Sequence, residues 1–345
     1  MSGSSLDGLD VCLCEFDHSD HGWNYKLLNT TTLELPQTLM EQLRTADQLS
    51  AEELTTLDLS YGSWIGEVLK VFLKTCPIRP ELIGIHGHTV FHDPIDKKIS
   101  LQIGNGVVIS ESTGIAVVDN FRMADISLGG QGAPLVPAGE HHLFPQHSIF
   151  LNLGGICNLS IHSADGITAW DIAPCNQVFN HFAQLQGQKY DSGGNMARSG
   201  QYHREWSKYI RSLDYFKQLP PKSLSNQWTQ KVLAHAPQRA EDALHTYAVT
   251  VSQLIADAIH IRQAEEVNVL VTGGGALNQF LVDQIKSRLI AGETLTIPDP
   301  GLIAYKEALI FGFLALLRKL NIPNVYASVT GAQRDSVSGD LHDVG

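Results

Sequence analysis

The chain has 345 residues, of which 43% are hydrophobic and 17% charged, and this composition excludes disordered, collagen-like and coiled-coil proteins. Its formal net charge of -12 disfavours a basic nucleic-acid-binding surface, so we expect no nucleic-acid partner. The five cysteines have no zinc-finger spacing, and no apolar run approaches the roughly 20 residues of a membrane span. The sequence has no signal peptide pattern. We therefore expect a cytoplasmic protein without membrane contact.

Short β-rich runs bounded by glycine, asparagine or aspartate alternate with helical patterns along the chain. A Gly/Ser/Asp-rich turn at 1–10 leads into the first predicted strand at 9–16, and a helix is predicted at about 57–75. Further strands are predicted at 81–87, 113–121, 147–155, 157–163, 167–172 and 267–275, and further helices at about 240–263 and 303–320. The pattern is that of a mixed α/β protein.

Four glycine clusters could bring backbone N–H groups close to a ligand, because glycine has no Cβ to keep it away. They are Gly3 to Gly8 with Ser4, Ser5 and Asp7; Gly129, Gly130 and Gly132 around Gln131; Gly154 with Gly155 near Asn158; and Gly273, Gly274 and Gly275. Each could instead be a tight turn. Neither a Rossmann nor a Walker string is present, but the four clusters together favour nucleotide binding.

The first and third glycine clusters each precede a strand, which makes SGSSLDGLDVCLCEF (2–16) and NLGGICNLSIH (152–162) similar. Two similar halves facing a cleft would explain this weak internal repeat, and two unrelated hairpins would explain it equally well.

Several carboxylates also lie at predicted turns and strand ends. Asp7 and Asp10 flank the first glycine turn, where they could hold Mg²⁺. Asp171 ends a predicted strand and could act as a general base, or it could cap the helix that begins near Asn176. Asp191 and Glu307 are further candidates, although Glu307 falls inside a helical pattern and could simply be solvated.

Histidines and cysteines offer weaker alternatives. His86, His88 and His92 could bind zinc, but no acidic or cysteine ligands accompany them, so sugar contacts or packing are favoured. Cys175 is near Asp171 and His181 in the sequence and could be a nucleophile, although no nucleophile turn supports that role.

Several longer strings, in order along nearly the whole chain, resemble the 1,6-anhydro-N-acetylmuramic acid kinase family of the sugar kinase, heat-shock-70 and actin superfamily. They are MSGSSLDGLD (1–10), HGHTVFHDP (86–94), LQIGNG (101–106), DNFRMADISLGGQGAPLVP (119–137), LNLGGICNLS (151–160), DIAPCN (171–176), VTGGGALN (271–278) and SVTGA (328–332).

The resemblance implies an α/β fold of two RNase-H-like, actin-like ATPase domains around a nucleotide cleft. The expected domains are 1–145 and 146–345, with an insertion near 186–239 and the last helix packing near the domain junction. Family members carry an apolar strand before the first glycine turn. Nothing precedes Met1 in this sequence, so the first strand of the first domain is expected to be missing.

The resemblance also implies a reaction: ATP-dependent, hydrolytic opening of 1,6-anhydro-N-acetylmuramic acid with phosphorylation of O6, in cell-wall sugar recycling. ATP and Mg²⁺ are the implied cofactors, the partner is the anhydro amino sugar, and a homodimer is expected. An inactive ATP-binding relative and a kinase of the same fold for another sugar are the alternatives.

Site residues follow from the matched motifs. Asp171 is expected to be the catalytic base and Asp7 and Asp10 the metal-side acids. The expected nucleotide-binding residues are Gly3, Ser4, Ser5, Leu6, Asp7, Gly8, Leu9, Asp10, Gly154, Gly155, Asn158, Gly273, Gly274 and Gly275, and the expected sugar-binding residues are His88, Arg122, Asp125, Gln131, Gly132 and Asn176. The family's Asp-Thr-Gly-Pro-Gly-Asn is DIAPCN here, and Ile172, Ala173 and Cys175 could narrow the site or change the sugar preference.

Overall fold

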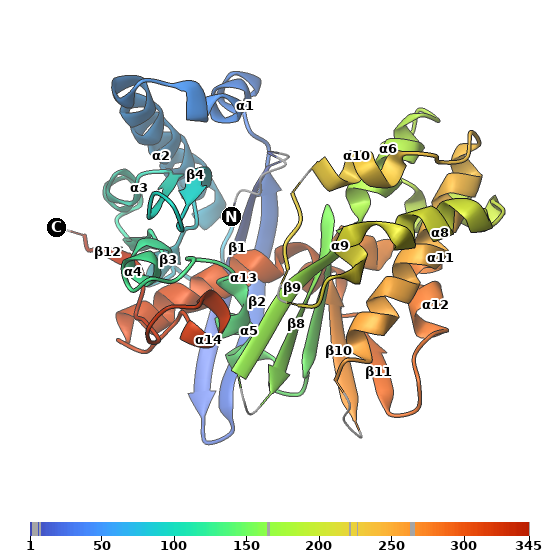
Figure 1. The fold of residues 1–345 in the computed structure, drawn as a ribbon. Coiled ribbons are helices and arrows are strands. Elements are labelled where there is room, and N and C mark those ends of the chain that lie inside the picture. Colours follow the sequence, from blue (N-terminus) through green and yellow to red (C-terminus); the bar gives the residue numbers. More distant parts are fainter. Residues whose placement is uncertain are drawn as a thin grey trace. The chain divides into compact units, whose positions relative to one another are not determined.

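The computed structural model describes residues 1, 6, 8–163, 166–220, 222–225, 227–262 and 266–344 (Figure 1). The chain forms two compact units. Unit 1 contains Met1–Pro145 and Tyr305–Gly345, and unit 2 contains Gln146–Ala304. Both contain strands and helices, so the predicted α/β class is confirmed.

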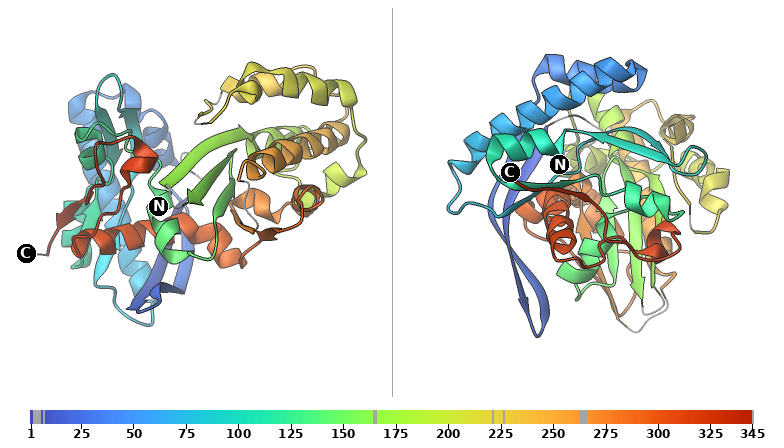
Figure 2. Two further views of the ribbon diagram at one scale, coloured as in Figure 1. Left: turned by 60° about the horizontal axis from the view of Figure 1, so that its bottom comes forward. Right: turned by 90° about the vertical axis from the view of Figure 1, so that its left-hand side faces the viewer.

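The described residues of unit 1 form three small sheets. One is the antiparallel pair β1–β2, the second has the order β12–β6–β3 with β3 parallel to β6, and the third is the hairpin β4–β5. The strands are β1 (Leu9–Ser19), β2 (Gly22–Leu33), β3 (Leu82–Gly84), β4 (His88–Asp93), β5 (Ile99–Ile103), β6 (Ala116–Asp119) and β12 (Asp340–His342). Figure 2 shows the ribbon in two further views.

Helix α2 (Ala51–Leu73) is the long helix of unit 1, and its start follows from the sequence. Ser50 accepts a hydrogen bond from the N–H of Glu53, whose side chain accepts one from the N–H of Ser50, so the two form a capping box. The buried face of α2, which includes Tyr61 and Ile65, packs into the core beneath β1. The other helices of unit 1 are α1 (Gln37–Arg44), η1 (Ala46–Gln48), α3 (Gly106–Thr113), α4 (Met123–Ser127), α5 (Val136–Leu143) and α14 (Ala327–Thr330).

Unit 2 is built on a five-stranded sheet with the order β11–β10–β7–β8–β9. β10 is parallel to β7 and β11, whereas β8 is antiparallel to β7 and β9, which is the strand order of an RNase-H-like domain. The strands are β7 (Ile149–Leu153), β8 (Ile156–Ser163), β9 (Gly166–Pro174), β10 (Val267–Thr272) and β11 (Glu293–Thr296).

Helix α11 (Ala240–Ile259) packs beside this sheet and forms the core of unit 2 with it. Its buried residues lie around most of the helix circumference. Short helices lie between 195 and 233, within the stretch where an insertion was predicted. The remaining helices are α6 (Asn176–Gln184), η2 (Ser192–Gly194), α7 (Asn195–Ser199), α8 (Arg204–Ser212), α9 (Asp214–Lys217), α10 (Gln227–Leu233), η3 (Gly274–Leu277) and α12 (Gln279–Lys286).

The last part of the chain lies elsewhere than expected. Residues 305–345 belong to unit 1, whereas the sequence analysis placed 146–345 in a single C-terminal domain. Strand β12 pairs antiparallel with β6, and the later residues of α13 (Pro300–Lys319) contact unit 1 side chains such as Phe16. This return crossing could not be read from local patterns.

Helix α13 also corrects the statement that no segment approaches a membrane span. α13 is long and apolar enough to be a candidate membrane span, but 56% of its apolar 18-residue stretch is buried inside the protein. Buried residues such as Leu309, Phe313 and Leu317 identify α13 as a core helix.

Candidate functional site

In unit 2, the carboxyl ends of the parallel strands β7 and β10 bring two predicted glycine loops together. Asn152, near the end of β7, pairs with Thr272 at the end of β10, so the turn at Gly154–Gly155 and the loop at Gly273–Gly275 start side by side. Ligands of α/β proteins bind at this edge of a sheet. Gly155 and Gly274 are exposed there, and Gly275 is buried beneath them.

The glycines of the second loop are required by close packing. Gly273 has a φ of +81°, and a Cβ added there would clash with Asn152 and lie 2.8 Å from the backbone carbon of Leu153. A Cβ on Gly275 would lie 2.7 Å from the Cβ of Leu153. Larger residues at either position would push the loop away from β7.

We therefore expect Gly273→Ala to lower the free energy of unfolding by about 1–3 kcal/mol and to weaken nucleotide binding, because positive φ and overpacking act together. The matched control is Gly274→Ala, since its new Cβ would lie no closer than 3.7 Å to Asn176. Urea denaturation of both variants tests this, and equal losses would show that the loop does not depend on close contact with β7.

A row of polar side chains crosses the sheet of unit 2 toward these loops. Asp171 of β9 pairs with Asn158 of β8, Asn158 pairs with Asn152, and Asn152 pairs with Thr272. Directly paired residues project from the same face, so the four side chains lie on one face of the sheet. The Thr272 hydroxyl is buried without a hydrogen-bond partner among the described residues. Asn152 and Thr272 were not predicted as site residues, because only the strand register brings them to the site.

Asp171 is half-buried at one end of this row. One carboxylate oxygen accepts a hydrogen bond from the N–H of Leu224 at 2.8 Å, and the backbone of Asp171 is held by the N–H···O bond to Lys222 and by the hydroxyl of Tyr215. Burial raises the pKa of the Asp171 carboxyl above its ordinary value, while the Leu224 N–H opposes that rise. A carboxylate with a raised pKa is a stronger base.

Asp171 does not cap helix α6, and Cys175 does not have the environment of a nucleophile. Cys175, and not Asp171, precedes α6, and no capping hydrogen bond from a side chain is present at that helix start. Cys175 is buried, and burial raises the pKa of its thiol to about 12, so a thiolate nucleophile is disfavoured.

Hydrogen bonds join Asn176 to the turn at Gly154–Gly155. Its side-chain amide donates to the carbonyl of Leu153 at 2.9 Å, and its backbone N–H donates to Gly154 at 3.0 Å. The N–H groups of Cys175 and Gln177 donate to Gly155. These bonds join the start of α6 to the predicted phosphate loop, so a change in the DIAPCN segment acts on the loop as well.

In unit 1, a second polar cluster surrounds Arg122. One guanidinium nitrogen donates to the carbonyl of Gly132 at 2.6 Å, another lies 2.7 Å from Nε2 of His86, and Nε is buried without a partner among the described residues. Burial lowers the pKa of Arg122 to about 10, and the neighbouring charge of Glu307 opposes that decrease.

His86 orients this arginine, whereas the sequence offered it only as a possible zinc ligand, sugar contact or packing residue. Burial, followed by the charge of Arg122, lowers the pKa of His86 to about 3, so the ring is neutral at neutral pH. Its Nδ1 lies 3.0 Å from the carbonyl of Gly87, which requires the proton to be on Nδ1. Nε2 is then the acceptor for Arg122, and this arrangement fixes a cation that can bind an anion.

Asp10 and Glu307 are the acidic side of the same cluster. Asp10 Oδ1 accepts a hydrogen bond from the hydroxyl of Thr32 at 2.6 Å. Glu307 has an exposed side, yet the surrounding protein raises the pKa of its carboxyl, and the charge of Asp10 adds to that rise. The Glu307 side chain is exposed, so its role stays a prediction.

The donor atoms of this cluster suit Mg²⁺, which nucleotide-dependent enzymes bind through one or two carboxylates together with substrate phosphates. Asp10 is oriented by Thr32 and has Glu307 as an acidic neighbour, so hard oxygen ligands are available. Asp7 lies outside the described residues, as do Gly3, Ser4 and Ser5, whereas Leu6 and Gly8 precede β1 and Leu9 is its first residue.

The other predicted sugar contacts have internal partners. Asp125 is fully buried and accepts hydrogen bonds from the hydroxyl of Thr330 and the N–H of Gly132, so it joins the SVTGA segment to the glycine turn. His88 lies 3.2 Å from the carbonyl of Leu43. The side chain of Gln131 is exposed. The roles of these residues toward a sugar stay predictions.

Glycine loops at the carboxyl ends of parallel strands are typical of α/β proteins that bind nucleotides. Comparison with known proteins specifies the class. A family model described as "Anhydro-N-acetylmuramic acid kinase" matches residues 1–343. Proteins of that name from Aliivibrio fischeri and Shewanella pealeana are 32% and 33% identical, and each alignment covers 99% of this chain and 97% of the relative.

A solved ROK hexokinase from Thermus thermophilus aligns with 89% of this chain and 100% of its own, at 12% identity and a TM-score of 0.37, which is too low to support an argument. The family model and the similar proteins are sufficient to assign the family. The chain belongs to the anhydro-N-acetylmuramic acid kinase family. It is therefore a kinase, an enzyme that uses a nucleotide substrate, and the predicted resemblance is confirmed.

Proposed function

We propose that this enzyme uses ATP to convert 1,6-anhydro-N-acetylmuramic acid into N-acetylmuramic acid 6-phosphate and ADP, in the recycling of cell-wall sugar. The observation that carries the proposal is the half-buried Asp171, whose carboxyl has a raised pKa and lies on the same sheet face as the row that ends at the glycine loops. We also propose a cytoplasmic location, in agreement with the five free cysteines.

The first half of the reaction is hydrolytic. The Asp171 carboxylate takes a proton from water as the water oxygen bonds to C1 of the sugar, and the bond from C1 to O6 breaks. The Leu224 N–H holds one oxygen of Asp171 and thereby orients the other. General-base assistance of this type contributes about 10²- to 10⁴-fold to a rate.

The second half transfers the phosphoryl group. The released O6 bonds to the γ-phosphorus of ATP, the bond to the β-phosphate oxygen breaks, and ADP leaves. Backbone N–H groups of the glycine loops are proposed to bind the phosphates, and Arg122 the carboxylate of the sugar. Mg²⁺, held by Asp10 with Asp7, would neutralise charge on the phosphates when bound.

The pH dependence of kcat follows from Asp171. A base must be ionised to act, and burial raises the pKa of this carboxyl, so activity falls as the pH decreases through a value above the ordinary aspartate pKa of about 3.9. We expect the acidic limb of a kcat profile to lie above that value. A limb at or below about 3.9 would contradict a buried base.

The experiment that tests the proposed function is ADP release with Mg²⁺, ATP and 1,6-anhydro-N-acetylmuramic acid. N-acetylmuramic acid, whose 1,6-anhydro bridge is already open, is the matched control because it offers a hydroxyl at O6 but no anhydro bond. ADP release that requires the anhydro sugar supports the proposal. Equal or greater release with the open sugar would assign the enzyme to simple phosphorylation.

A further inference from the structure

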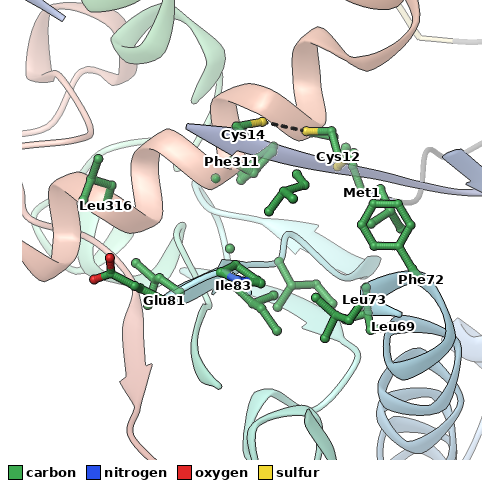
Figure 3. Close-up of a pocket in the computed structure, with 18 of the residues that line it drawn as sticks. Met1, Cys12, Cys14, Leu69, Phe72, Leu73, Glu81, Ile83, Phe311 and Leu316 are labelled. Atoms are coloured by element: carbon green, nitrogen blue, oxygen red, sulfur yellow. Dashed lines mark hydrogen bonds between the residues drawn. The ribbon is translucent and has the colours of Figure 1, made fainter. Parts of the chain in front are cut away.

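The strand edges of the two units have different surroundings. In unit 1, a cavity of about 560 Å³ lies between β1 and β3 and is lined by apolar side chains such as Leu69 and Phe311 (Figure 3). In unit 2, β9 is the last strand of its sheet, and residues 213–220 and 222–225, here called the edge segment, cover its free edge at Asp171. Backbone groups at a strand edge need partners, so the segment that supplies them helps to fix the strand end.

Three hydrogen bonds join the edge segment to Asp171. The N–H of Asp171 donates to the carbonyl of Lys222 at 3.0 Å, and the carbonyl of Asp171 accepts from the hydroxyl of Tyr215 at 2.6 Å. The N–H of Leu224 donates to the Asp171 carboxylate at 2.8 Å. Because Leu224 is only two residues after Lys222, the position of the Lys222 backbone limits where this N–H can lie.

The ammonium group of Lys222 holds the edge segment together. It donates to the carbonyls of Tyr215 at 3.0 Å and Gln218 at 2.9 Å, and it lies 4.6 Å from the centre of the Tyr215 ring. Both carbonyls belong to the carboxyl end of α9, where lysine side chains commonly bond the last carbonyls of a helix. A side chain without donors would leave both carbonyls without this partner.

Few groups act on the Asp171 carboxyl. Burial raises its pKa, and the N–H of Leu224 opposes that rise. The titratable side chains that face it are Cys157 of β8 and Tyr215 of α9. Burial raises the pKa of both groups, and the charge of Asp171 adds to the rise, so both are uncharged at neutral pH.

Helices α10 and α11 also contact β9 and carry two further titratable groups. Lys231 of α10 lies 4.0 Å from the centre of the Trp228 ring, and the Tyr247 hydroxyl of α11 donates to the carbonyl of Pro174. Both groups therefore have partners of their own. A change in the edge segment would act on the carboxylate through the N–H of Leu224.

We propose that Lys222 is a positioning residue for Asp171: its ammonium group holds the edge segment on β9 and thereby keeps the N–H of Leu224 on the carboxylate. Without it, the carboxylate loses part of a charge-assisted hydrogen bond. The effect on the rate rests on the proposed function, whereas the effect on the carboxyl requires no substrate. A separate bond from the Thr229 hydroxyl to Gln177 joins α10 to α6 and does not involve Lys222.

The test is Lys222→Met, which keeps the length of the side chain and removes its donors. In protein labelled with ¹³Cγ-aspartate and free of substrate, the Asp171 signal is the one that is absent from Asp171→Asn. We expect its titration midpoint to be higher in Lys222→Met by about half to one pH unit, because a hydrogen bond to a charged group favours the ionised form by about tenfold or more. The matched control is Lys217→Met, which removes an exposed charge of the same segment and should leave the midpoint unchanged.

Turnover provides a second readout. In Lys222→Met the acidic limb of the kcat profile should move to higher pH together with the carboxyl midpoint. Above that limb kcat should fall by roughly tenfold, while the KM for ATP changes little. Lys222→Arg should restore both, because a guanidinium group can donate to the two carbonyls and stack on the Tyr215 ring.

Lys222 is partly exposed, so its variants should fold. Lys222→Gln is measured beside Lys222→Met and should shift the midpoint in the same direction, because its shorter amide cannot serve both carbonyls. A midpoint in either variant equal to that of Lys217→Met would overturn the proposal. A shifted midpoint in an enzyme that is inactive on the anhydro sugar would support the positioning role and contradict the proposed function.

Discussion

Asp171→Asn is expected to lower kcat by about 10²- to 10⁴-fold, while the affinity for ATP changes little. Asparagine has nearly the same shape and still offers an oxygen to the Leu224 N–H, so the segment around it should keep its structure. It cannot accept the proton of water, which the proposed reaction requires. Steady-state kinetics and ATP titration of the same preparation measure the two effects separately.

The matched control is Asp214→Asn, in which an acid whose side chain is 91% exposed is changed in the same way. It should turn over like the unchanged enzyme. Loss of ATP affinity in the Asp171 variant that equals its loss of kcat would show a structural role. A loss of less than tenfold would show that another group is the base.

Lys306→Met is expected to reduce the free energy of unfolding by about 3–5 kcal/mol, because it removes the ammonium group that pairs with the buried Glu140 carboxylate. The two groups lie 2.7 Å apart, and their side chains are only 7% and 4% exposed. The pair joins the start of α13 to α5 within unit 1. Urea denaturation with the midpoint and slope both fitted measures the loss.

A surface pair of similar geometry provides the control. Lys70 and Glu67 are 2.9 Å apart but well exposed, so Lys70→Met should cost less than about 1 kcal/mol. The double variant Lys306→Met with Glu140→Leu should recover much of the stability, because it removes both charges. A loss in the single variant that is no larger than that of the surface control would contradict the role of burial.

Local patterns predicted most of the fold. The strands now seen as β7, β8 and β10 and the helices α2 and α11 have runs of apolar residues with regular spacing, and the structure confirms them. The hairpin strand β2, with its polar run of threonines, and the short strand β12 have no such signal. β12 pairs with β6, which is far away in the sequence, and β2 is specified by its pairing with the preceding strand β1 and not by its own residues.

The candidate site, like the fold, was predicted only where the sequence carries a local signal. Motifs identified Asp171 and the glycine loops, because the reaction needs those residue types at turns and strand ends. Asn152 and Thr272 were missed, since their places depend on the register of three strands. His86 was a candidate, but its contact with Arg122 was not predicted.

The central claim is that one enzyme opens the anhydro bond with water and phosphorylates the oxygen released. The most direct measurement is the reaction of 1,6-anhydro-N-acetylmuramic acid with ATP in ¹⁸O-labelled water, followed by mass spectrometry and ³¹P NMR of the product. We predict one ¹⁸O atom on C1, none in the phosphate, and phosphate on O6. Labelled inorganic phosphate with an unchanged sugar, or a phosphorylated sugar that keeps its anhydro bond, would contradict the account.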